Sequence, residues 1–175
     1  MTTTESIKKA IDALTIQDVY LRELRLTIAS DYDSKTGQPA ALTNLGWGSK
    51  SAATIEIEDT ETKQKTTLWK VQFAVRCRLL KPIEPLPPEN YEPKPEEILA
   101  TIESVFVAEY VLTDKSIEPE ALAEFAQHNV AYHVWPYWRE QIHDITTRAL
   151  LPRVTLPMHV FKPKPPTTSE EAVQK

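Results

Sequence analysis

The amino-acid sequence predicts an α+β fold, in which an antiparallel sheet of four strands is followed by two helices. Two observations predict this class. Between Leu14 and Leu112, four segments alternate apolar and polar residues, which is the pattern of strands with one buried face. From Pro119 to Leu151, apolar residues recur instead at the spacing of amphipathic helices.

Residues 1–13 are predicted to form a short N-terminal helix or extension, because their apolar residues follow helical spacing. The long strand that comes next has Leu24 on one face, whereas Val19 and Leu21 fall on the opposite phase. An extra residue in one strand shifts the phase of the side chains after it. We therefore expect a bulge or a change of face near Arg22.

Residues 30–50 are interpreted as a loop, because aspartate, glycine and proline interrupt regular structure there. Trp47 lies in this loop between two glycines. An aromatic residue in such a setting is more often a hydrophobic plug than a ligand contact, and both interpretations stay open. The second strand follows, where Ala53, Ile55 and Ile57 alternate with polar residues.

The third strand shows the clearest alternation, since every second residue from Trp69 to Leu79 is apolar. Six prolines then interrupt residues 81–97, which predicts a stiff, extended surface connector. A ligand for a proline-binding module is a less favoured alternative for this segment. The fourth strand, at 98–112, is apolar on both faces, which predicts a partial cover or a binding surface on the second face.

Two helices are predicted to follow the sheet, and Pro119 opens the first of them. Pro136 suits the first turn of the second helix, which we expect to end before Pro152. Large apolar side chains crowd the inward stripes of both helices and are predicted to form the core or an oligomer contact: Phe125, Trp135, Trp138 and Ile142.

Composition limits the classes of function. The chain has 175 residues and a net charge of −5, which argues against a nucleic acid partner because binding phosphates needs a positive field. No apolar run is long enough to span a membrane, and the N-terminus lacks a signal-peptide pattern. The single cysteine, Cys77, fits a cytoplasmic protein. We expect one domain at 14–161 and a disordered tail at 162–175.

No motif for catalysis, a cofactor or a metal ion emerges. The four histidines lack the paired spacing of a helical zinc site, and no phosphate-binding loop or nucleophile elbow occurs. Cys77 lies on the apolar face of the third strand, where a buried thiol is inert. We therefore expect no enzyme, no cofactor and no metal site.

The second helix and the segment behind it contain three short motifs: Pro136-Tyr137-x-Arg139-Glu140-x-Ile142, Leu151-Pro152 and Leu156-Pro157. With the four alternating strands ahead of two helices, these motifs resemble the SecB family of protein-export chaperones. The resemblance covers residues 14–161. It implies a four-stranded antiparallel sheet with two C-terminal helices packed on one face, assembled as a homotetramer from two dimers.

SecB chaperones hold unfolded polypeptides in apolar grooves without ATP and deliver preproteins to the SecA motor. The resemblance implies four client-contacting residues, to which we add Trp47: Tyr137, Ala53, Ile55 and Ile57. The resemblance also implies that Glu23 and Glu103 dock SecA. Thr27 stands where the family has another acidic residue. That departure, and a tail unlike the family's, count against delivery to SecA.

Alternative functions stay open. The connector, the N-terminal helix and the altered tail are closer to atypical SecB-like chaperones, which accompany toxin–antitoxin modules and bind an antitoxin. A small-molecule-binding domain that uses the aromatic cluster is a more distant alternative, and a purely structural oligomer is another. A compact pocket with convergent histidines would favour small-molecule binding, whereas an open apolar groove would favour a chaperone.

Overall fold

The computed structural model describes residues 3–36, 42–88 and 91–157. Its elements follow one another as α1 (Thr3–Ala13), β1 (Leu14–Ile28), β2 (Leu42–Glu58), β3 (Lys65–Leu80), a short 3₁₀ helix (Pro95–Glu97), β4 (Ile98–Leu112), α2 (Pro119–His128) and α3 (Val130–Arg148). The tail at 162–175, which the sequence predicts to be disordered, lies outside the described residues.

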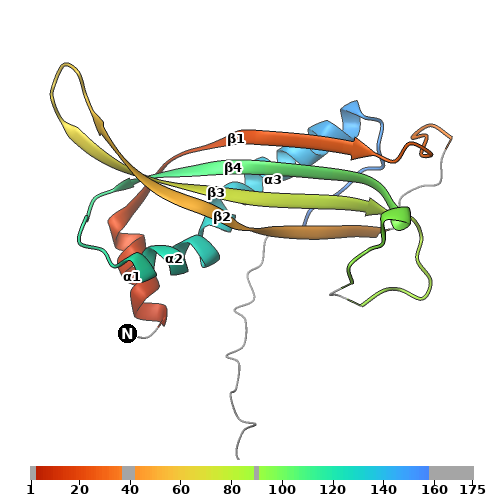
Figure 1. Cartoon of the computed structure of the whole chain (residues 1–175), viewed down its shortest axis with the longest axis horizontal. Coiled ribbons are helices and arrows are strands. Elements are labelled where there is room, and N and C mark those ends of the chain that lie inside the picture. The colour runs from red at the N-terminus through yellow and green to blue at the C-terminus, as the bar shows by residue number, and fades with distance from the viewer. Residues whose placement is uncertain (1–2, 37–41, 89–90, 158–175) are drawn as a thin grey trace, which may run out of the picture.

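The four strands form one antiparallel sheet in the order β1-β4-β3-β2, so β1 and β2 are its edge strands. The helices α2 and α3 pack on one face of this sheet, with α1 beside α2 (Figure 1). The predicted α+β class with two C-terminal helices on one face is confirmed. We call the covered side the helix face and the other side the open face.

The core lies between the helix face and the helices. Every second residue of β3 from Trp69 to Leu79 is buried in it, as the alternation predicts. At one end, Trp69, Tyr110 and Phe125 form a cluster of tilted and edge-to-face rings with centroids 5.3–6.1 Å apart. Burying a large apolar side chain contributes about 1.5–3 kcal/mol, so this layer holds the helices to the sheet.

One polar contact is built into this core. Tyr110 Oη lies 2.8 Å from Nδ1 of His133, which projects from α3. Burial lowers the pKa of His133 and raises the pKa of Tyr110, so both groups are neutral near neutral pH. The hydrogen bond satisfies the buried Tyr110 hydroxyl and the part-buried His133 ring, and fixes the position of α3 over β4.

The strand β2 is longer than the sequence predicts. It begins at Leu42, so the loop expected at 30–50 is wrong from that residue onward. Trp47 pairs with Val75 inside the strand, and the glycines on either side of it have no positive φ. Backbone hydrogen bonds to β3 do not depend on side chains, so the ladder continues through glycines that hide the alternation.

Two register shifts interrupt the pairing of β1 with β4. One falls at Arg22, where the sequence predicts a bulge, and the other falls at Gln17. Each shift moves the later residues by one position relative to β4. Val19 and Leu21 therefore lie on the same face as Leu24, although the phase of the sequence places them on opposite faces.

The helix α3 begins at Val130, well before Pro136, so the expectation that this proline lies in the first turn is wrong. Asn129 alone separates α2 from α3. A proline inside a helix removes one backbone hydrogen bond. Its neighbours Trp135 and Trp138 are both buried, and their packing offsets that loss.

The proline-rich connector at 81–97 contains no strand in its described part. It folds back toward the open face of the sheet, where the carboxylate of Glu92 binds Arg78 of β3. Asn44 Nδ2 donates to the carbonyl of Tyr91 at 3.1 Å, and the Tyr91 hydroxyl donates to Glu97. The connector is therefore tethered at both the sheet and its own C-terminal end.

Candidate functional site

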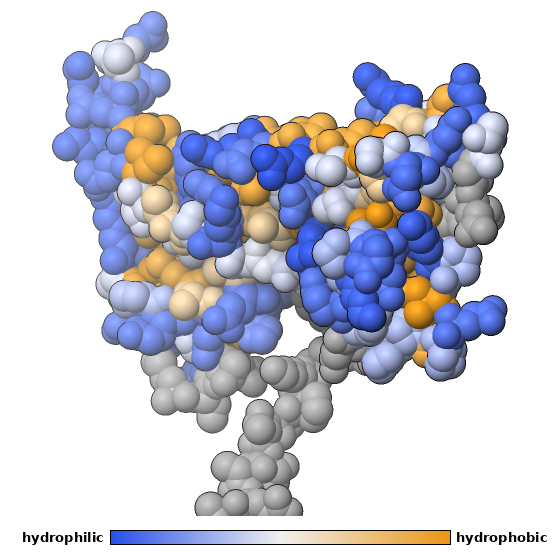
Figure 2. All heavy atoms as spheres, turned by 45° about the vertical axis from the view of Figure 1, so that its right-hand side comes forward, coloured by the Kyte–Doolittle hydropathy of each residue, from blue (hydrophilic) through white to orange (hydrophobic). Residues whose placement is uncertain are grey.

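A row of large apolar side chains remains uncovered along β1. Five of them on the helix face are each 38–49% exposed, and we call them the β1 row: Ile16, Leu21, Leu24, Leu26 and Ile28. Their neighbours on β4 are buried, as shown by Phe106 opposite Leu21 and Ile102 opposite Leu26. Apolar atoms gather along the upper edge of the molecule, where β1 runs (Figure 2). The β1 row thus extends the core onto the surface.

Trp47 and Trp135 mark the flank of α3 that faces β2. Their rings meet edge to face with centroids 5.5 Å apart, and Trp135 Nε1 donates to the carbonyl of Pro157 at 2.9 Å. Trp47 is 48% exposed. It therefore covers Trp135 at the margin of the core and leaves half of its own surface to solvent.

Tyr137 lies on the other flank of α3, beside β1. His133 and Gln141, one turn before and one turn after it, both bind β4. In the second of these contacts Ser104 Oγ donates to Gln141 Oε1 at 2.7 Å. Residues four apart share one side of a helix, so Tyr137 lies between these two anchors. It is 46% exposed, and α3 contacts β1 on the helix face, the side of the sheet that carries the β1 row.

The predicted second-strand row lies elsewhere. Ala53, Ile55 and Ile57 are on the open face, where Ile55 pairs with Leu68. The side chains of Ile55 and Ile57 are 43% and 48% exposed. Because Tyr137 is on the helix side of the sheet, the structure does not bring the predicted client contacts together on one surface.

The residues predicted for the core or an oligomer contact are all buried within this chain. Trp138 and Ile142 have no exposed surface, and Phe125 and Trp135 are 3% and 5% exposed. Trp138 also meets Trp135 edge to face, with ring centroids 4.8 Å apart. These four side chains therefore attach α2 and α3 to the sheet.

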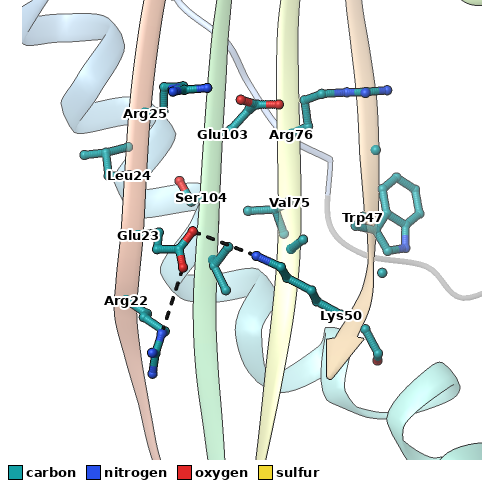
Figure 3. Close-up of a pocket in the computed structure, with 15 residues that line it drawn as sticks. Arg22, Glu23, Leu24, Arg25, Trp47, Lys50, Val75, Arg76, Glu103 and Ser104 are labelled. Carbon is teal, nitrogen blue, oxygen red and sulfur yellow. Dashed lines mark ion pairs between the residues drawn. The ribbon is translucent and has the colours of Figure 1, made fainter. Parts of the chain in front are cut away.

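The two acidic residues predicted to dock SecA share the open face. Glu23 Oε2 lies 4.0 Å from Lys50 Nζ. Glu103 is opposite Arg25 on one side and opposite Arg76 on the other, and Figure 3 shows it between them. Both carboxylates thus lie among cations rather than in an acidic patch.

The described residues offer little support for catalysis or metal binding. Cys77 is buried on the helix face, and burial raises its pKa to about 12, so the thiol stays protonated at neutral pH. Among the described residues, no group of three or more His, Cys, Asp or Glu side chains is placed to hold a metal ion. In the same ranges, no helix has the length and apolar composition needed to cross a membrane.

The β1 row is the part of the site that sequence reasoning missed. Alternation of Leu24, Leu26 and Ile28 indicates a common face, but not whether anything covers that face. Its exposure follows from the strand order, which places β1 at an edge, and from the path of α3. The spacing of residues within one strand contains neither piece of information.

No protein-family model and no curated protein matches this sequence. Among solved structures, the chain is similar to a SecB-like chaperone of Mycobacterium tuberculosis in complex with a ChAD peptide from the HigA1 antitoxin. The identity is 17%, the TM-score is 0.60, and the match covers 90% of this chain and 96% of that chain.

A protein of unknown function from Streptococcus agalactiae matches at 12% identity over 82% of this chain and 96% of that one. Its TM-score of 0.38 is too low to inform the fold. The mycobacterial match, by contrast, has a TM-score of 0.60 over nine tenths of this chain. The chain therefore has a SecB-like fold.

Proposed function

We propose that the protein is a cytoplasmic, ATP-independent chaperone that holds unfolded or aggregation-prone polypeptides. The observation that supports this most is the β1 row with Tyr137 beside it. Unfolded chains expose apolar side chains, and covering a half-exposed residue of the row contributes roughly 1 kcal/mol. Tyr137 adds contact area with few rotamers to order on binding.

The backbone of β1 supports the same function. As an edge strand, β1 pairs only with β4 among the described residues, so its outer amide and carbonyl groups have no strand partner there. An extended client can add to such an edge through main-chain hydrogen bonds, which are independent of sequence. This combination suits a chaperone that accepts many clients.

A homotetramer built from two dimers is the assembly that we propose. The β1 row is a large apolar surface for a monomer to leave exposed, and a second copy would bury part of it. Sedimentation equilibrium at micromolar concentration is expected to give the mass of four chains. A monomer alone at that concentration would contradict this assembly.

An antitoxin segment is the client class that we favour. A solved structure with a similar fold is that of a SecB-like chaperone in complex with an antitoxin peptide. If this chain serves the same purpose, a toxin–antitoxin pair should lie beside its gene, and the antitoxin should co-purify with it. Failure of the neighbouring antitoxin to bind would remove this candidate.

Delivery of preproteins to SecA is the second candidate. Glu23 and Glu103 are its proposed docking residues, and the structure has them on one surface. The cations around them weaken the attraction for a basic docking segment. Isothermal titration with SecA tests this role. Binding that is lost in Glu23→Lys/Glu103→Lys would support export, and no binding by the unaltered chain would contradict it.

Tyr137→Ala separates binding from stability. The side chain is half exposed, so we expect the free energy of unfolding to change by only about 0.5 kcal/mol. Suppression of the aggregation of a slow-folding client should weaken clearly, because exposed aromatic residues are typical binding hot spots. Urea melts and light scattering measure the two effects.

Tyr132→Ala is the matched control, because Tyr132 is 48% exposed on the same helix but lies away from the Tyr137 flank. It should leave the suppression of aggregation unchanged. Equal losses in both variants would remove the assignment to the Tyr137 flank. If neither variant alters suppression, the client site lies elsewhere, with the Ala53–Ile57 row the first place to look.

A further inference from the structure

The open face of the sheet contains a hollow that client binding at the β1 row does not use, although Glu23 and Glu103 of the export candidate line it. Its floor carries small residues on two neighbouring strands, with Gly46 and Gly48 on β2 and Ala74 on β3. A Cβ added at Gly48 would have no atom within 4 Å, which shows how open the floor is. Longer side chains rise around it and enclose about 1200 Å³.

Cations predominate around this hollow. Its walls hold two carboxylates, Glu23 and Glu103, and four basic side chains: Arg22, Arg25, Lys50 and Arg76. Figure 3 shows these side chains spread over all four strands, with the helices behind the sheet. On a chain with a net charge of −5, such a surface is a local reversal of charge.

The basic side chains are incompletely neutralised by the chain itself. The contacts of Glu23 with Arg22 and with Lys50 are both 4.0 Å long. Among the described residues, no carboxylate lies within ion-pair distance of Arg25. In the same ranges, the buried Nε of Arg76 has no hydrogen-bond partner.

The connector shows which chemical group these cations bind. Glu92 places its carboxylate on Arg78 and 3.9 Å from Arg76, at the edge of the hollow. The segment that presents it, at residues 91–94, is neither helical nor β-paired. A carboxylate of the connector is thus already bound at one end of the surface, whereas Arg25 farther along has no carboxylate within ion-pair distance among the described residues.

We propose that this hollow docks an extended acidic segment of a partner protein. Carboxylates of the segment would pair with Arg25, Arg76 and Lys50, and its backbone would lie over Gly48 of β2, which no side chain covers within 4 Å. The hollow is on the open face and the β1 row is on the helix face, so both surfaces can be occupied at once. The inference goes beyond the proposed client binding and does not rest on it.

A protein segment fits better than a nucleic acid. Two carboxylates line the hollow, and the chain as a whole is acidic, so a continuous phosphate backbone would be repelled. The floor of glycine and alanine suits close approach of a peptide backbone. An acidic peptide has a lower charge density and can place its carboxylates between the two glutamates.

The test uses a rhodamine-labelled peptide of alternating glutamate and alanine. A labelled peptide of alternating lysine and alanine, which has the opposite charge, is the control. Fluorescence anisotropy should show that the full chain binds only the acidic peptide, and less tightly as salt rises. Arg25→Glu/Arg76→Glu should bind roughly tenfold more weakly or worse, because each lost charge-assisted contact is worth about that factor.

Three further variants serve as controls for this test. Lys8→Glu/Lys35→Glu changes the net charge equally at exposed sites outside the hollow and should bind normally. Gly48→Val fills the hollow without altering any charge, and the space around Gly48 accepts its side chain, so it should fold and bind weakly. Tyr137→Ala should bind the acidic peptide unchanged, which separates this surface from the client site.

Several results would overturn the proposal. Equal binding of the acidic peptide to the unaltered chain and to Arg25→Glu/Arg76→Glu would show that the peptide binds outside the hollow. If the unaltered chain did not bind the acidic peptide at all, the hollow would not be a site for acidic segments. Tighter binding of a single-stranded RNA than of the acidic peptide would show that the partner is a nucleic acid and not an acidic protein segment. A change of oligomer mass in the charge-reversed variant would make the surface a contact between copies of this chain.

Discussion

Replacing Trp138 by alanine is expected to lower the free energy of unfolding by about 3–5 kcal/mol. The indole has no exposed surface and packs edge to face on Trp135, so its removal leaves a cavity between α3 and the sheet. Its Nε1 has no hydrogen-bond partner among the described residues, so packing accounts for the whole loss. Urea-induced unfolding followed by circular dichroism measures it.

Trp47→Ala provides the comparison for that result. The same side chain is removed, but Trp47 is 48% exposed and meets Trp135 at the margin of the core. Its loss should cost clearly less, because fewer buried contacts disappear and solvent fills the space. If the two variants lost equal stability, α3 would not be held to the sheet through Trp138.

Leu26→Asp is expected to reduce client binding by about tenfold or more while the fold is retained. Leu26 is 39% exposed toward the C-terminal end of the β1 row, so the free chain can leave the carboxylate in water. A bound apolar client would cover that charge without a partner for it, which is costly. Affinity for an unfolded client and suppression of its aggregation should fall together.

Leu86→Asp is the matched substitution for this experiment. Leu86 is the most exposed large apolar residue of the described chain, at 76%, and lies in the connector far along the sequence from β1. The change of residue and charge is the same, but client binding should persist. Unchanged binding in Leu26→Asp, with a melting curve like that of the unaltered chain, would exclude the β1 row as the client surface.

Much of the fold could be predicted because local patterns specify it. The alternation in β3 reports a strand buried on one face, and the structure buries the predicted residues from Trp69 to Leu79. The prolines after Leu80 exclude a ladder, and the described connector has none. Errors arose where tertiary contacts override local preference, as for Pro136 inside α3 and for the glycines flanking Trp47 in β2.

The candidate site was less predictable than the fold. Resemblance to SecB indicated Tyr137 and the Ala53–Ile57 row, but these lie on opposite faces of the sheet. Which face a strand residue occupies depends on register and bulges, and whether it is covered depends on strand order. Predicting the β1 row requires both facts, because two bulges place Ile16, Leu21 and Leu24 on one face and the edge position leaves them exposed.

Amide hydrogen exchange of the protein, measured with and without a slow-folding client, shows whether clients bind along β1. The outer amides of β1 have no strand partner among the described residues, so those that a second copy leaves uncovered exchange quickly until a client chain covers them. We expect a bound client to slow exchange along Leu14–Ile28 and around Tyr137 on α3. Protection confined to the β2–β3 hairpin around Ile55, or no protection anywhere while the client is bound, would contradict it.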